Sequence, residues 1–528
     1  SNHKLMYKIP DVAGFEWGCD DETIYYTKMD AAHRPYQVWK NKSNKSNKLI
    51  YEEKDELFWV GLSKTFDREL LLIGSGSKET SEISFIDLRS NVDDLTMVKK
   101  RTQGVLYSLS KRNDLFYIVT NIENAKNFQV LVAKIDEPDN WEPFVDVSGK
   151  IIFCNDENRS INHTTAFHNF LMIFGRENGL RQAWCVNFDE DNVLDYHKLE
   201  FPESAYVVGL GSNMEYNSDT VRITYSSMIT PHTIFDYVVS NKEFKLVKQK
   251  NVPNFNQLEY ETKRVYAPSK DGTMIPISVV YRKDFHLDGI KNSKLMLYGY
   301  GSYGSCIEPR FNSGILPMLD RGIVYCIAHI RGGSEMGRSW YEDQGKYLTK
   351  KNTFVDFCSC AEFLIEQGWT IPENIAIEGR SAGGLLIGAV LNMRPDLFNV
   401  AIAGVPFVDV MTTMCDPSIP LTVVEWEEWG NPNEEKFYDY INSYSPIDNV
   451  VEQRYPNILI TTGLHDPRVA YWEGMKWCAT LREKADSDSG LILLKTDIEA
   501  GHFSASDRYK YLREKAFEFA FLFDCLNL

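Results

Sequence analysis

A serine stands between glycines in the stretch GRSAGG, where Gly379, Gly383 and Gly384 surround Ser381. The apolar run NIAIEG before it is typical of a buried strand, and LLIGAVLNM after it is typical of a helix with an apolar face. A serine on such a sharp strand-to-helix turn exposes its Oγ, and the helix N-terminus stabilises negative charge beside it. The pattern predicts a nucleophile, although a small residue that only fills a tight turn would give the same letters.

A nucleophilic serine needs a base and an acid that orients the base, and in this kind of fold both follow it along the chain. Only His465 and His502 come after Ser381. Asp466 ends the run NILITTGLHD, and His502 follows the next run, LILLKTDIEAGHF. We therefore predict the order Ser381, Asp466, His502, with His465 as a packing residue and Asp497 too near His502 in sequence to orient it.

The oxyanion of an acyl-transfer reaction needs hydrogen-bond donors aimed at the developing charge. One is normally the backbone N–H after the nucleophile, which belongs here to Ala382. The other should come from the loop after an earlier strand, and LMLYGYGSYG is a glycine-rich loop in that place. Its tyrosines, Tyr298, Tyr300 and Tyr303, could equally serve ring packing.

Apolar runs alternate with helical patterns from about residue 256 to the end of the chain. They include KLMLYGYG, GIVYCIAHI, FVDFCSCAEFLIEQG and NILITTGL, after a hairpin predicted around Asp271 and Gly272. Such alternation predicts a mostly parallel sheet covered on both faces. Functional residues gather at the carboxyl ends of the strands in such sheets, which is where the candidate residues stand.

The first half of the chain repeats itself. Strand-like runs begin at Thr23, Glu69, Asp114, Asn169 and Thr220, and a second series begins at Gln37, Glu82, Gln129, Gln182 and Thr233. Both series advance in step by roughly 50 residues, which favours the blades of a β-propeller. A two-sheet sandwich with evenly spaced strands is the alternative, but it has no reason to keep both series in phase.

The formal net charge of −17 argues against a nucleic-acid partner, because phosphate binding needs clustered Lys and Arg. It is compatible with cationic substrates, although ordinary solubility explains it equally well. The ten cysteines are scattered and show no zinc-finger spacing. No apolar run is long enough for a membrane span, and the N-terminus lacks a signal-peptide core, so we expect a cytoplasmic protein that binds no membrane.

The motifs GRSAGG, LYGYGSYG, RGGSEMG, GLHDPRV and EAGH, in this order and behind a propeller, resemble the prolyl oligopeptidase family (S9) of serine peptidases. The stretch VPFVDVMTTMCDPSIPLTVVEWEEWGNP, residues 405–432, resembles the oligopeptidase B branch, which cleaves after Arg or Lys. The resemblance covers nearly the whole chain. It implies a catalytic triad of Ser381, Asp466 and His502, with Tyr300 as the side-chain donor of the oxyanion hole.

The resemblance also implies substrate-binding residues. Glu425 and Glu427 match the paired glutamates of a pocket for a basic residue, and carboxylates bind guanidinium by charge-assisted bonds. Without the resemblance, VEWEEWG would be interpreted as a solvated acidic turn. Arg468 matches an arginine that binds a substrate carbonyl or carboxylate. Glu308 matches the first of two acids that hold a basic P2 residue, but the second position is Arg310, which puts a preference for paired basic residues in doubt.

The chain departs from the family pattern in its propeller. The family has seven blades preceded by a segment that packs on the catalytic domain, whereas about five blade units and no such segment are visible here. Either residues are missing from the sequence or the propeller is open or atypical.

We predict a β-propeller domain over residues 1–255 and an α/β-hydrolase domain, with a doubly wound and mostly parallel sheet, over residues 256–528. The expected function is a serine oligopeptidase, monomeric or dimeric, that hydrolyses short basic peptides after Arg or Lys without metal or cofactor. Its nearest alternative is a prolyl or acyl-peptide hydrolase of the same family. The alternative of another class is a non-catalytic propeller scaffold whose triad is a relic.

Overall fold

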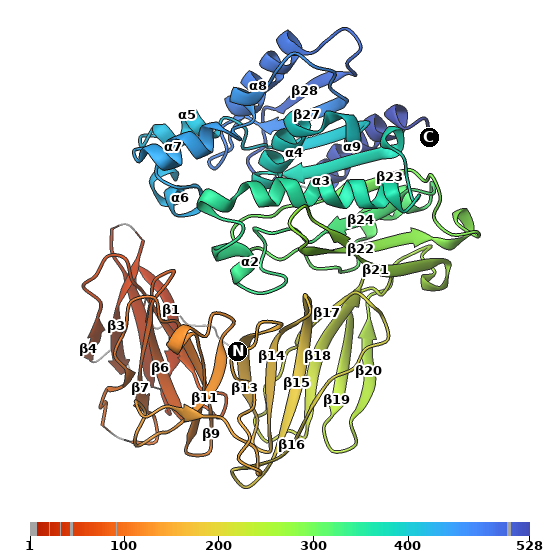
Figure 1. Cartoon of the computed structure of the whole chain (residues 1–528). Helices are drawn as coiled ribbons and strands as arrows, with labels where there is room; N and C mark the ends of the chain where they lie inside the picture. The colour runs from red at the N-terminus through yellow and green to blue at the C-terminus, as the bar shows by residue number, and fades with distance from the viewer. Residues whose placement is uncertain (1–7, 21, 32, 43–45, 91, 504–507) are drawn as a thin grey trace, which may run out of the picture.

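The chain forms two parts, one built of small antiparallel sheets and one built of a larger sheet with helices on both faces (Figure 1). The computed structural model describes residues 8–20, 22–31, 33–42, 46–90, 92–503 and 508–528. Within those residues, no helix is both long and apolar enough to cross a lipid bilayer.

The N-terminal part is a β-propeller of five four-stranded antiparallel sheets (Figure 1). The first two sheets contain β1 (Val12–Trp17), β2 (Thr23–Met29), β3 (Pro35–Lys42), β4 (Ser46–Glu52), β5 (Trp59–Lys64), β6 (Leu70–Gly76), β7 (Ser81–Asp87) and β8 (Thr96–Lys99). The third and fourth contain β9 (Tyr107–Arg112), β10 (Leu115–Thr120), β11 (Gln129–Lys134), β12 (Glu142–Pro143), β13 (Arg159–Ala166), β14 (Phe170–Glu177), β15 (Leu180–Asp189) and β16 (Asn192–Lys198). The fifth contains β17 (Tyr206–Leu210), β18 (Thr220–Ser227), β19 (Thr233–Val238) and β20 (Glu243–Gln249).

The two repeating series of the sequence are the second and third strands of these sheets. The first series marks β2, β6, β10, β14 and β18, and the second marks β3, β7, β11, β15 and β19. Every sheet consists of four consecutive strands, so the propeller prediction is confirmed and the sandwich alternative is wrong.

Neighbouring sheets of the propeller pack face to face through apolar side chains of alternating direction. In β6, Leu71 and Ile73 pack in a cluster with the first sheet, whereas Leu70 and Leu72 pack in a cluster with the third. This follows from the two-residue period of a strand, which sends successive side chains to opposite faces. Central strands covered by a sheet on each face, such as β6 and β10, are therefore largely apolar, whereas β18 of the fifth sheet alternates Val221 and Ile223 with Arg222 and Thr224.

Four such clusters join the five sheets in series, first to second, second to third, third to fourth and fourth to fifth. Among the described residues, no apolar cluster joins the first sheet to the fifth. The described sheets therefore form an arc held mainly by contacts between neighbours, with Phe66 between β5 and β6 also packing against Phe167 of the fourth sheet's cluster.

The C-terminal part is an α/β domain built on an eight-stranded sheet in the order β21-β22-β24-β23-β25-β26-β27-β28. Its strands are β21 (Tyr260–Pro268), β22 (Met274–Arg282), β23 (Leu295–Tyr298), β24 (Val324–Ala328), β25 (Ile375–Arg380), β26 (Val400–Gly404), β27 (Asn457–Gly463) and β28 (Ile492–Asp497). The strands from β24 to β28 pair in parallel, and β21 and β22 form the hairpin that was predicted around Asp271 and Gly272.

Helices cover both faces of this sheet. The longer ones are α3 (Lys351–Glu366), α4 (Ala382–Met393), α8 (Tyr471–Lys484) and α9 (Arg508–Cys525). Ile375 and Ile377 of β25 share an apolar cluster with α3, α4 and α8, whereas Ala376 between them shares a second cluster with α1 (Leu316–Leu319) and α9. The mostly parallel, doubly covered sheet predicted from the sequence is confirmed.

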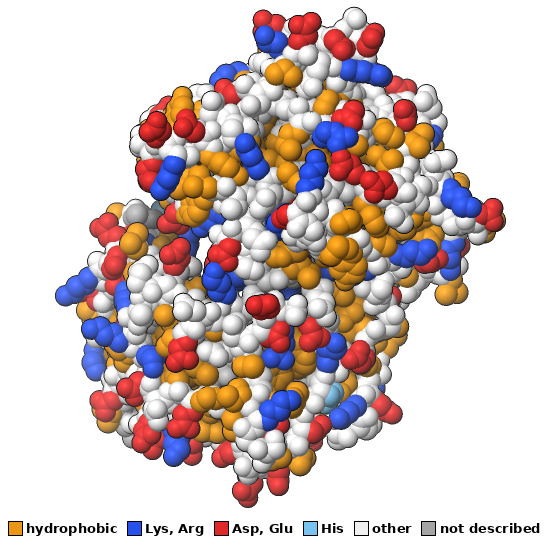
Figure 2. All heavy atoms as spheres, viewed as in Figure 1, with side chains coloured by type: hydrophobic (Ala, Val, Ile, Leu, Met, Phe, Trp, Pro, Cys, Tyr) orange, Lys and Arg blue, Asp and Glu red, His pale blue; other side chains and the backbone are white. Residues whose placement is uncertain are grey.

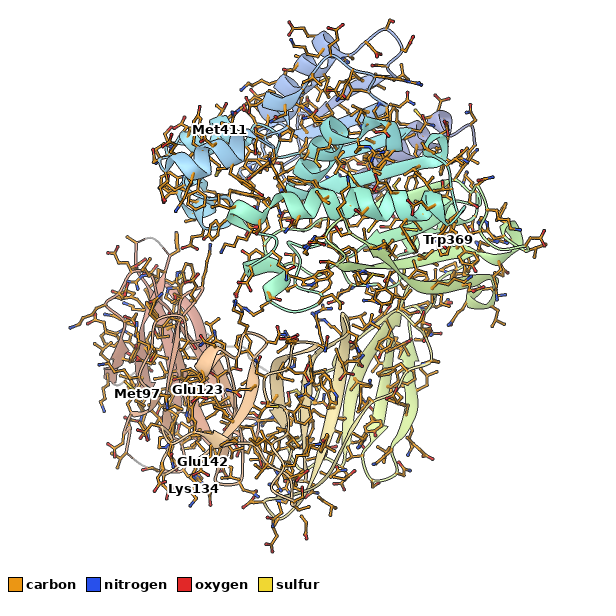
Figure 3. The ribbon with its side chains drawn as sticks, in the orientation of Figure 1. Met97, Glu123, Lys134, Glu142, Trp369 and Met411 are labelled. Atoms are coloured by element: carbon orange, nitrogen blue, oxygen red, sulfur yellow. The ribbon has the colours of Figure 1, made fainter. Side chains whose placement is uncertain are left out.

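Shorter helices sit at the carboxyl edge and in the loops: α2 (Ser339–Glu342), α5 (Val410–Cys415), α6 (Thr422–Trp429) and α7 (Glu435–Asn442). The 3₁₀ turns span Ile122–Asn124, Gln257–Glu259, Lys283–Phe285, Ser313–Ile315, Tyr347–Thr349, Pro372–Asn374, Pro395–Leu397 and Ile447–Asn449. Figure 3 labels Met411 of α5 and Trp369 after α3, which lie toward opposite sides of the α/β part and both pack in its larger apolar cluster.

The propeller contains a buried ion pair whose loss we expect to be costly. Lys111 in β9 is 2% exposed, and its Nζ lies 2.5 Å from Asp67 and 2.6 Å from Glu69 in the preceding sheet. Lys111→Ala would leave the buried Asp67 without a cation, whereas the partly exposed Glu69 would keep Arg89 at 3.0 Å, so we expect the free energy of unfolding to fall by about 2–3 kcal/mol. Thermal unfolding checks this against Lys134→Ala at an exposed position (Figure 3). Equal unfolding midpoints would contradict the expectation.

Candidate active site

Ser381 occupies the turn between β25 and α4 in a backbone conformation of positive φ. Its φ is 57° and its ψ is −121°, which is unfavourable for a residue with a Cβ atom. Its N–H donates to the carbonyl of Gly404 over 2.9 Å, so the turn is tied to the neighbouring strand β26. This is the strained strand-to-helix turn that exposes a nucleophile.

Two glycines allow the chain to come this close to itself. A Cβ atom on Gly379 would lie 2.2 Å from the carbonyl oxygen of Gly383, and one on Gly384 would lie 2.5 Å from the Cα of Pro406. Both contacts are with backbone atoms, which cannot move aside as a flexible side chain could. The glycines of GRSAGG are therefore required by the packing of β25 and α4.

Ser381, His502 and Asp466 form a hydrogen-bonded chain. Ser381 Oγ lies 3.1 Å from His502 Nε2, and His502 Nδ1 lies 2.7 Å from Asp466 Oδ2. Since a carboxylate only accepts, Nδ1 carries the proton, and Nε2 is left to accept from the serine hydroxyl. The structure brings together the three residues that the sequence predicted, and the geometry suits general-base activation of Ser381.

Asp466 is held so that one oxygen faces the histidine. Its Oδ1 accepts from the N–H groups of Arg468 at 2.8 Å and Val469 at 3.0 Å, and its side chain is fully buried. The neighbouring His465 is exposed, so its interpretation as a packing residue is wrong. Asp497, at the end of β28, lies 3.0 Å from the Nζ of Lys510.

Tyr300 and Ala382 line the same cleft as Ser381 and His502. Burial, together with the nearby Tyr298 and the carboxylates of Glu428 and Glu425, raises the pKa of the Tyr300 hydroxyl to about 12. The hydroxyl therefore keeps its proton at neutral pH and can donate a hydrogen bond. Ala382 is the first residue of α4, where backbone N–H groups have no partner within the helix. Both predicted oxyanion donors stand beside the nucleophile.

A buried lysine supports the loop that carries Tyr300. Lys350 is 1% exposed, and its Nζ donates to the carbonyl of Gly301 and, over 2.8 Å, to Ser302 Oγ. Burial lowers its pKa to about 8. Sequence analysis did not reveal this contact, because Lys350 lies far along the chain from the loop and has no distinguishing neighbours.

The cleft has a volume of about 540 Å³, and among the described residues a single carboxylate, that of Glu425, lines it together with aromatic side chains. Glu425 Oε2 accepts from the Tyr303 hydroxyl at 2.8 Å and from Trp429 Nε1 at 3.0 Å. Its Oε1 accepts no hydrogen bond from the residues that the structure describes. One carboxylate oxygen is thus fixed and the other is available to a ligand.

The structure does not bring Glu427 into this cleft. Its carboxylate is 61% exposed and lies 3.2 Å from Lys78 of the propeller. VEWEEWG forms the helix α6 rather than a turn, and residues two apart on a helix point to nearly opposite sides. Glu428, three residues after Glu425, lies on the same side instead, is buried, and accepts from the Tyr303 N–H at 2.8 Å. The three-residue spacing of Glu425 and Glu428, which places both on one side of a helix, was the signal in the sequence that would have identified Glu428.

The other two predicted binding residues lie apart from each other. Arg468 lines the cleft, with its guanidinium 5.0 Å from the centre of the Phe503 ring. Glu308 lies in neighbouring cavities and accepts from two arginines of the propeller, Arg176 and Arg181. Its side chain is 6% exposed, so in this structure its charge is already neutralised from the propeller side.

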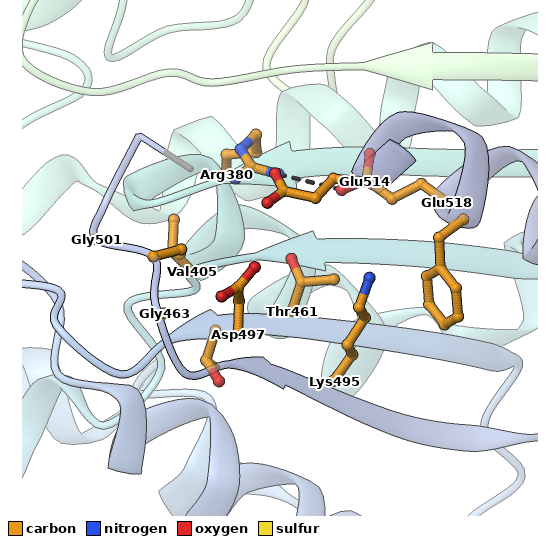
Figure 4. Close-up of a pocket in the computed structure, with 12 residues that line it drawn as sticks. Arg380, Val405, Thr461, Gly463, Lys495, Asp497, Gly501, Glu514 and Glu518 are labelled. Carbon is orange, nitrogen blue, oxygen red and sulfur yellow. Dashed lines mark hydrogen bonds and ion pairs between the residues drawn. The ribbon is translucent and has the colours of Figure 1, made fainter. Parts of the chain in front are cut away.

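A small cavity lies behind the catalytic turn (Figure 4). It is lined by Arg380 and Gly501, which precede Ser381 and His502, and Arg380 pairs there with Glu518 of α9 at 3.3 Å. Its volume of about 40 Å³ is room for about one water molecule and excludes a peptide side chain. The larger cleft, which is lined by Ser381 and His502 themselves, has the room that this cavity lacks.

A carboxylate that the sequence analysis missed holds one wall of that cleft. Glu473 of α8 is fully buried and accepts from the N–H groups of Val408 and Asp409, each at 3.0 Å, and from Thr413 Oγ1 at 2.9 Å. These residues belong to the segment after β26 whose Phe407 and Thr413 line the cleft. Glu473 therefore fixes the position of that wall.

Comparisons with known proteins agree with this arrangement. A model of the prolyl oligopeptidase family matches residues 309–528, and a model of the N-terminal β-propeller domain of prolyl oligopeptidase matches residues 7–250. Protease 2 of Moraxella lacunata is 40% identical over 532 residues, which cover 99% of this chain and 74% of that protein.

Two further relatives carry different names. Dipeptidyl aminopeptidase BI of Pseudoxanthomonas mexicana is 38% identical over 519 residues, which cover 97% of this chain and 69% of that protein. The structure of oligopeptidase B from Trypanosoma brucei with covalently bound antipain is 48% identical, with a TM-score of 0.85. That match covers 97% of this chain and 73% of the Trypanosoma chain.

The burial of Glu473 makes stability depend on pH. Desolvation raises its pKa from 4.5 to about 7, so the unfolded chain loses this proton at a lower pH than the folded protein does. Stability should therefore fall as pH rises from about 4.5 to 7, by up to about 3 kcal/mol.

Glu473→Gln can keep all three hydrogen bonds without a charge. We expect the variant to unfold like the parent at pH 4.5 and to be more stable at pH 8, as measured by denaturant unfolding at both values. A parent protein that is the more stable of the two at pH 8 would contradict the assignment.

Proposed function

The chain belongs to the prolyl oligopeptidase family of serine peptidases, and we propose that it hydrolyses short peptides on the carboxyl side of Arg or Lys. The observation that carries this proposal is the carboxylate of Glu425 in the cleft that also holds Ser381 and His502. A guanidinium or ammonium group bound to Glu425 would place the following peptide bond near the nucleophile.

The hydrogen-bonded chain supports an acyl-enzyme mechanism. Ser381 Oγ attacks the carbonyl carbon of the scissile bond while His502 Nε2 accepts the hydroxyl proton. The tetrahedral oxyanion receives hydrogen bonds from the Tyr300 hydroxyl and the Ala382 N–H. His502 then gives its proton to the leaving amine as the C–N bond breaks. Water, activated by the same histidine, attacks the ester and releases the acid and Ser381.

Glu425 is suited to select a basic P1 residue. Tyr303 and Trp429 hold its Oε2, and a substrate cation would compensate the charge at Oε1. Phe407 and Trp429 provide apolar surface for the aliphatic stem of Arg or Lys. We assign the P1 contact to Glu425 alone, because Glu427 pairs with Lys78 outside the cleft.

The position of the site supports a preference for short substrates. Ion pairs join the two parts, between Lys78 and Glu427 and between Lys126 and Asp343. In the space-filling view the two parts meet along a seam with a gap at its left side (Figure 2). A folded protein would be too large for such a seam, whereas an extended peptide would fit.

Three alternatives differ in what they require of the site. A prolyl or acyl-peptide hydrolase needs an apolar pocket, and a buried carboxylate disfavours an apolar P1 residue. A dipeptidyl aminopeptidase needs a free substrate N-terminus, so it would not cleave N-blocked peptides. A non-catalytic scaffold needs no reactive serine.

We expect an N-blocked Arg anilide to be cleaved at least about a hundredfold faster than the matching Pro anilide, because Pro would leave Glu425 without a partner. Initial rates of chromophore release measure this. Comparable rates for the two substrates would overturn the proposed specificity. Cleavage that occurs only with an unblocked N-terminus would favour an aminopeptidase.

Ser381→Ala should abolish labelling by a fluorophosphonate and lower kcat at least about 10⁴-fold, because no other group in the site can form the ester. Mass spectrometry of the labelled protein measures the adduct and its position. A parent protein that folds but takes no label would favour the scaffold.

Glu425→Gln should lower kcat/KM for the Arg anilide about 30- to 100-fold, because a charge-assisted hydrogen bond becomes a neutral one. Hydrolysis of a small activated acetate ester, which does not reach Glu425, should change by less than about twofold. Glu435→Gln makes the same change at an exposed position in α7 and serves as the matched control. Equal losses on both substrates would indicate damage to the fold instead of a lost P1 contact.

A further inference from the structure

Arg310 lies where three cavities meet. One cavity, of about 640 Å³, extends from His502 and Phe503 to Glu308 and Arg310. A second, of about 470 Å³, and a third, of about 480 Å³, continue from Arg310 along the fourth propeller sheet, and both include Arg181. A peptide that runs from the nucleophile along this side must therefore pass the Arg310 side chain.

The second cavity is lined by four arginines and one carboxylate. The arginines are Arg176, Arg181, Arg310 and Arg338, and the carboxylate is Glu308. Two of these cations share the same oxygen of that carboxylate, since Glu308 Oε1 accepts from Arg176 and, at 2.7 Å, from Arg181.

The remaining two arginines differ. Arg338 Nε donates to Glu342 over 2.9 Å, so it has its own counter-ion. Arg310 is exposed, and its guanidinium makes no ion pair or hydrogen bond with the residues that the structure describes. One further carboxylate, that of Glu335, lies nearby and is buried, where it accepts from the N–H of Ile307. Even with Glu335 counted, the arginines outnumber the carboxylates.

We propose that this arginine-lined cavity binds an anionic group at Arg310. The chemistry is that of a carboxylate or phosphate, since a guanidinium pairs with either through two parallel hydrogen bonds. Two sources are open to it: an acidic side chain of the peptide that flanks the basic P1 residue, or a free anion. The inference rests on the proposed function for the position of the peptide, but the binding of the anion does not require turnover.

The excess of positive charge in this arginine-lined cavity, which is partly screened from water, also affects which peptide side chains the cavity would favour. A basic side chain at this point would meet Arg310. Of the two nearby acids, Glu308 already pairs with Arg176 and Arg181, and Glu335 is buried. The substrate class is thus a peptide with a basic residue at P1 and an acidic residue beside it, rather than a pair of basic residues.

The test measures the binding of fluorescein-labelled peptides to the Ser381→Ala protein by fluorescence anisotropy, which needs no catalysis. One panel carries Arg at P1 and places Glu, Gln or Lys in turn at P3, P2, P1′ and P2′. We expect at least one position where the Glu peptide binds about tenfold more tightly than the Gln peptide, and where the Lys peptide binds more weakly than the Gln peptide.

The ratio of the Gln-peptide Kd to the Glu-peptide Kd should approach one in Arg310→Gln on the same background. In Arg310→Glu the preference should reverse, so that the Lys peptide binds most tightly. Arg454→Gln, an exposed arginine that precedes β27 at the opposite edge of the sheet, should leave the ratio unchanged.

A second arm identifies the source of the anion. If no position prefers Glu, but inorganic phosphate at millimolar concentration shifts the binding of an Arg peptide in the parent background and not in Arg310→Gln, the anion is free. If neither effect appears while the N-blocked Arg anilide is cleaved by the unmodified enzyme, the inference is wrong and the proposed function stands. If that anilide is not cleaved, the proposed function fails, and the anisotropy ratios still decide for or against the cavity.

Discussion

The backbone at Ser381 is held in a conformation that residues with a Cβ atom seldom adopt, and the rest of the site is arranged around it. Its cost of roughly 1–3 kcal/mol must be offset by the surrounding packing. The offset comes from the hydrogen bond of Ser381 N–H to Gly404 and from the close approach of β25, α4 and β26, which two glycines permit. Since α4 begins directly after the turn, the same geometry points the helix N-terminus at the place where negative charge would develop.

The residues that line the cleft belong to the α/β part, but acidic side chains of that part form ion pairs with basic side chains of the propeller. Lys78 faces Glu427, and Arg176 and Arg181 face Glu308, so propeller side chains meet two of the acids that the sequence associated with substrate. Any change in the distance between the two parts would therefore change the pairing of these acids. Under the proposed function, selectivity would depend on both parts together.

The sequence was sufficient for the architecture and for the triad. Two strand series in phase identified the propeller, and the chain order of serine, acid and histidine, each after its own strand, identified Ser381, Asp466 and His502. Both signals are local and periodic, so they survive without knowledge of tertiary contacts. Glu427 was placed in the pocket on the resemblance alone, whereas the helical period of α6 sends it to a different side from Glu425. Lys350 and Glu473 were missed because their roles depend on burial and on hydrogen bonds to residues that are remote in sequence. These partners are Gly301 for Lys350 and Val408 for Glu473.

The arrangement of apolar clusters in the propeller makes it a linear stack. Each inner sheet is covered by a neighbour on both faces, whereas the first and fifth described sheets each share only one of the four clusters. In a stack held mainly by contacts between neighbours, local opening requires the loss of one such cluster at an end and of two in the middle. Amide hydrogen exchange should therefore be slowest in the central strands of the third sheet and should quicken toward both ends, so the two ends can move while the middle keeps its shape.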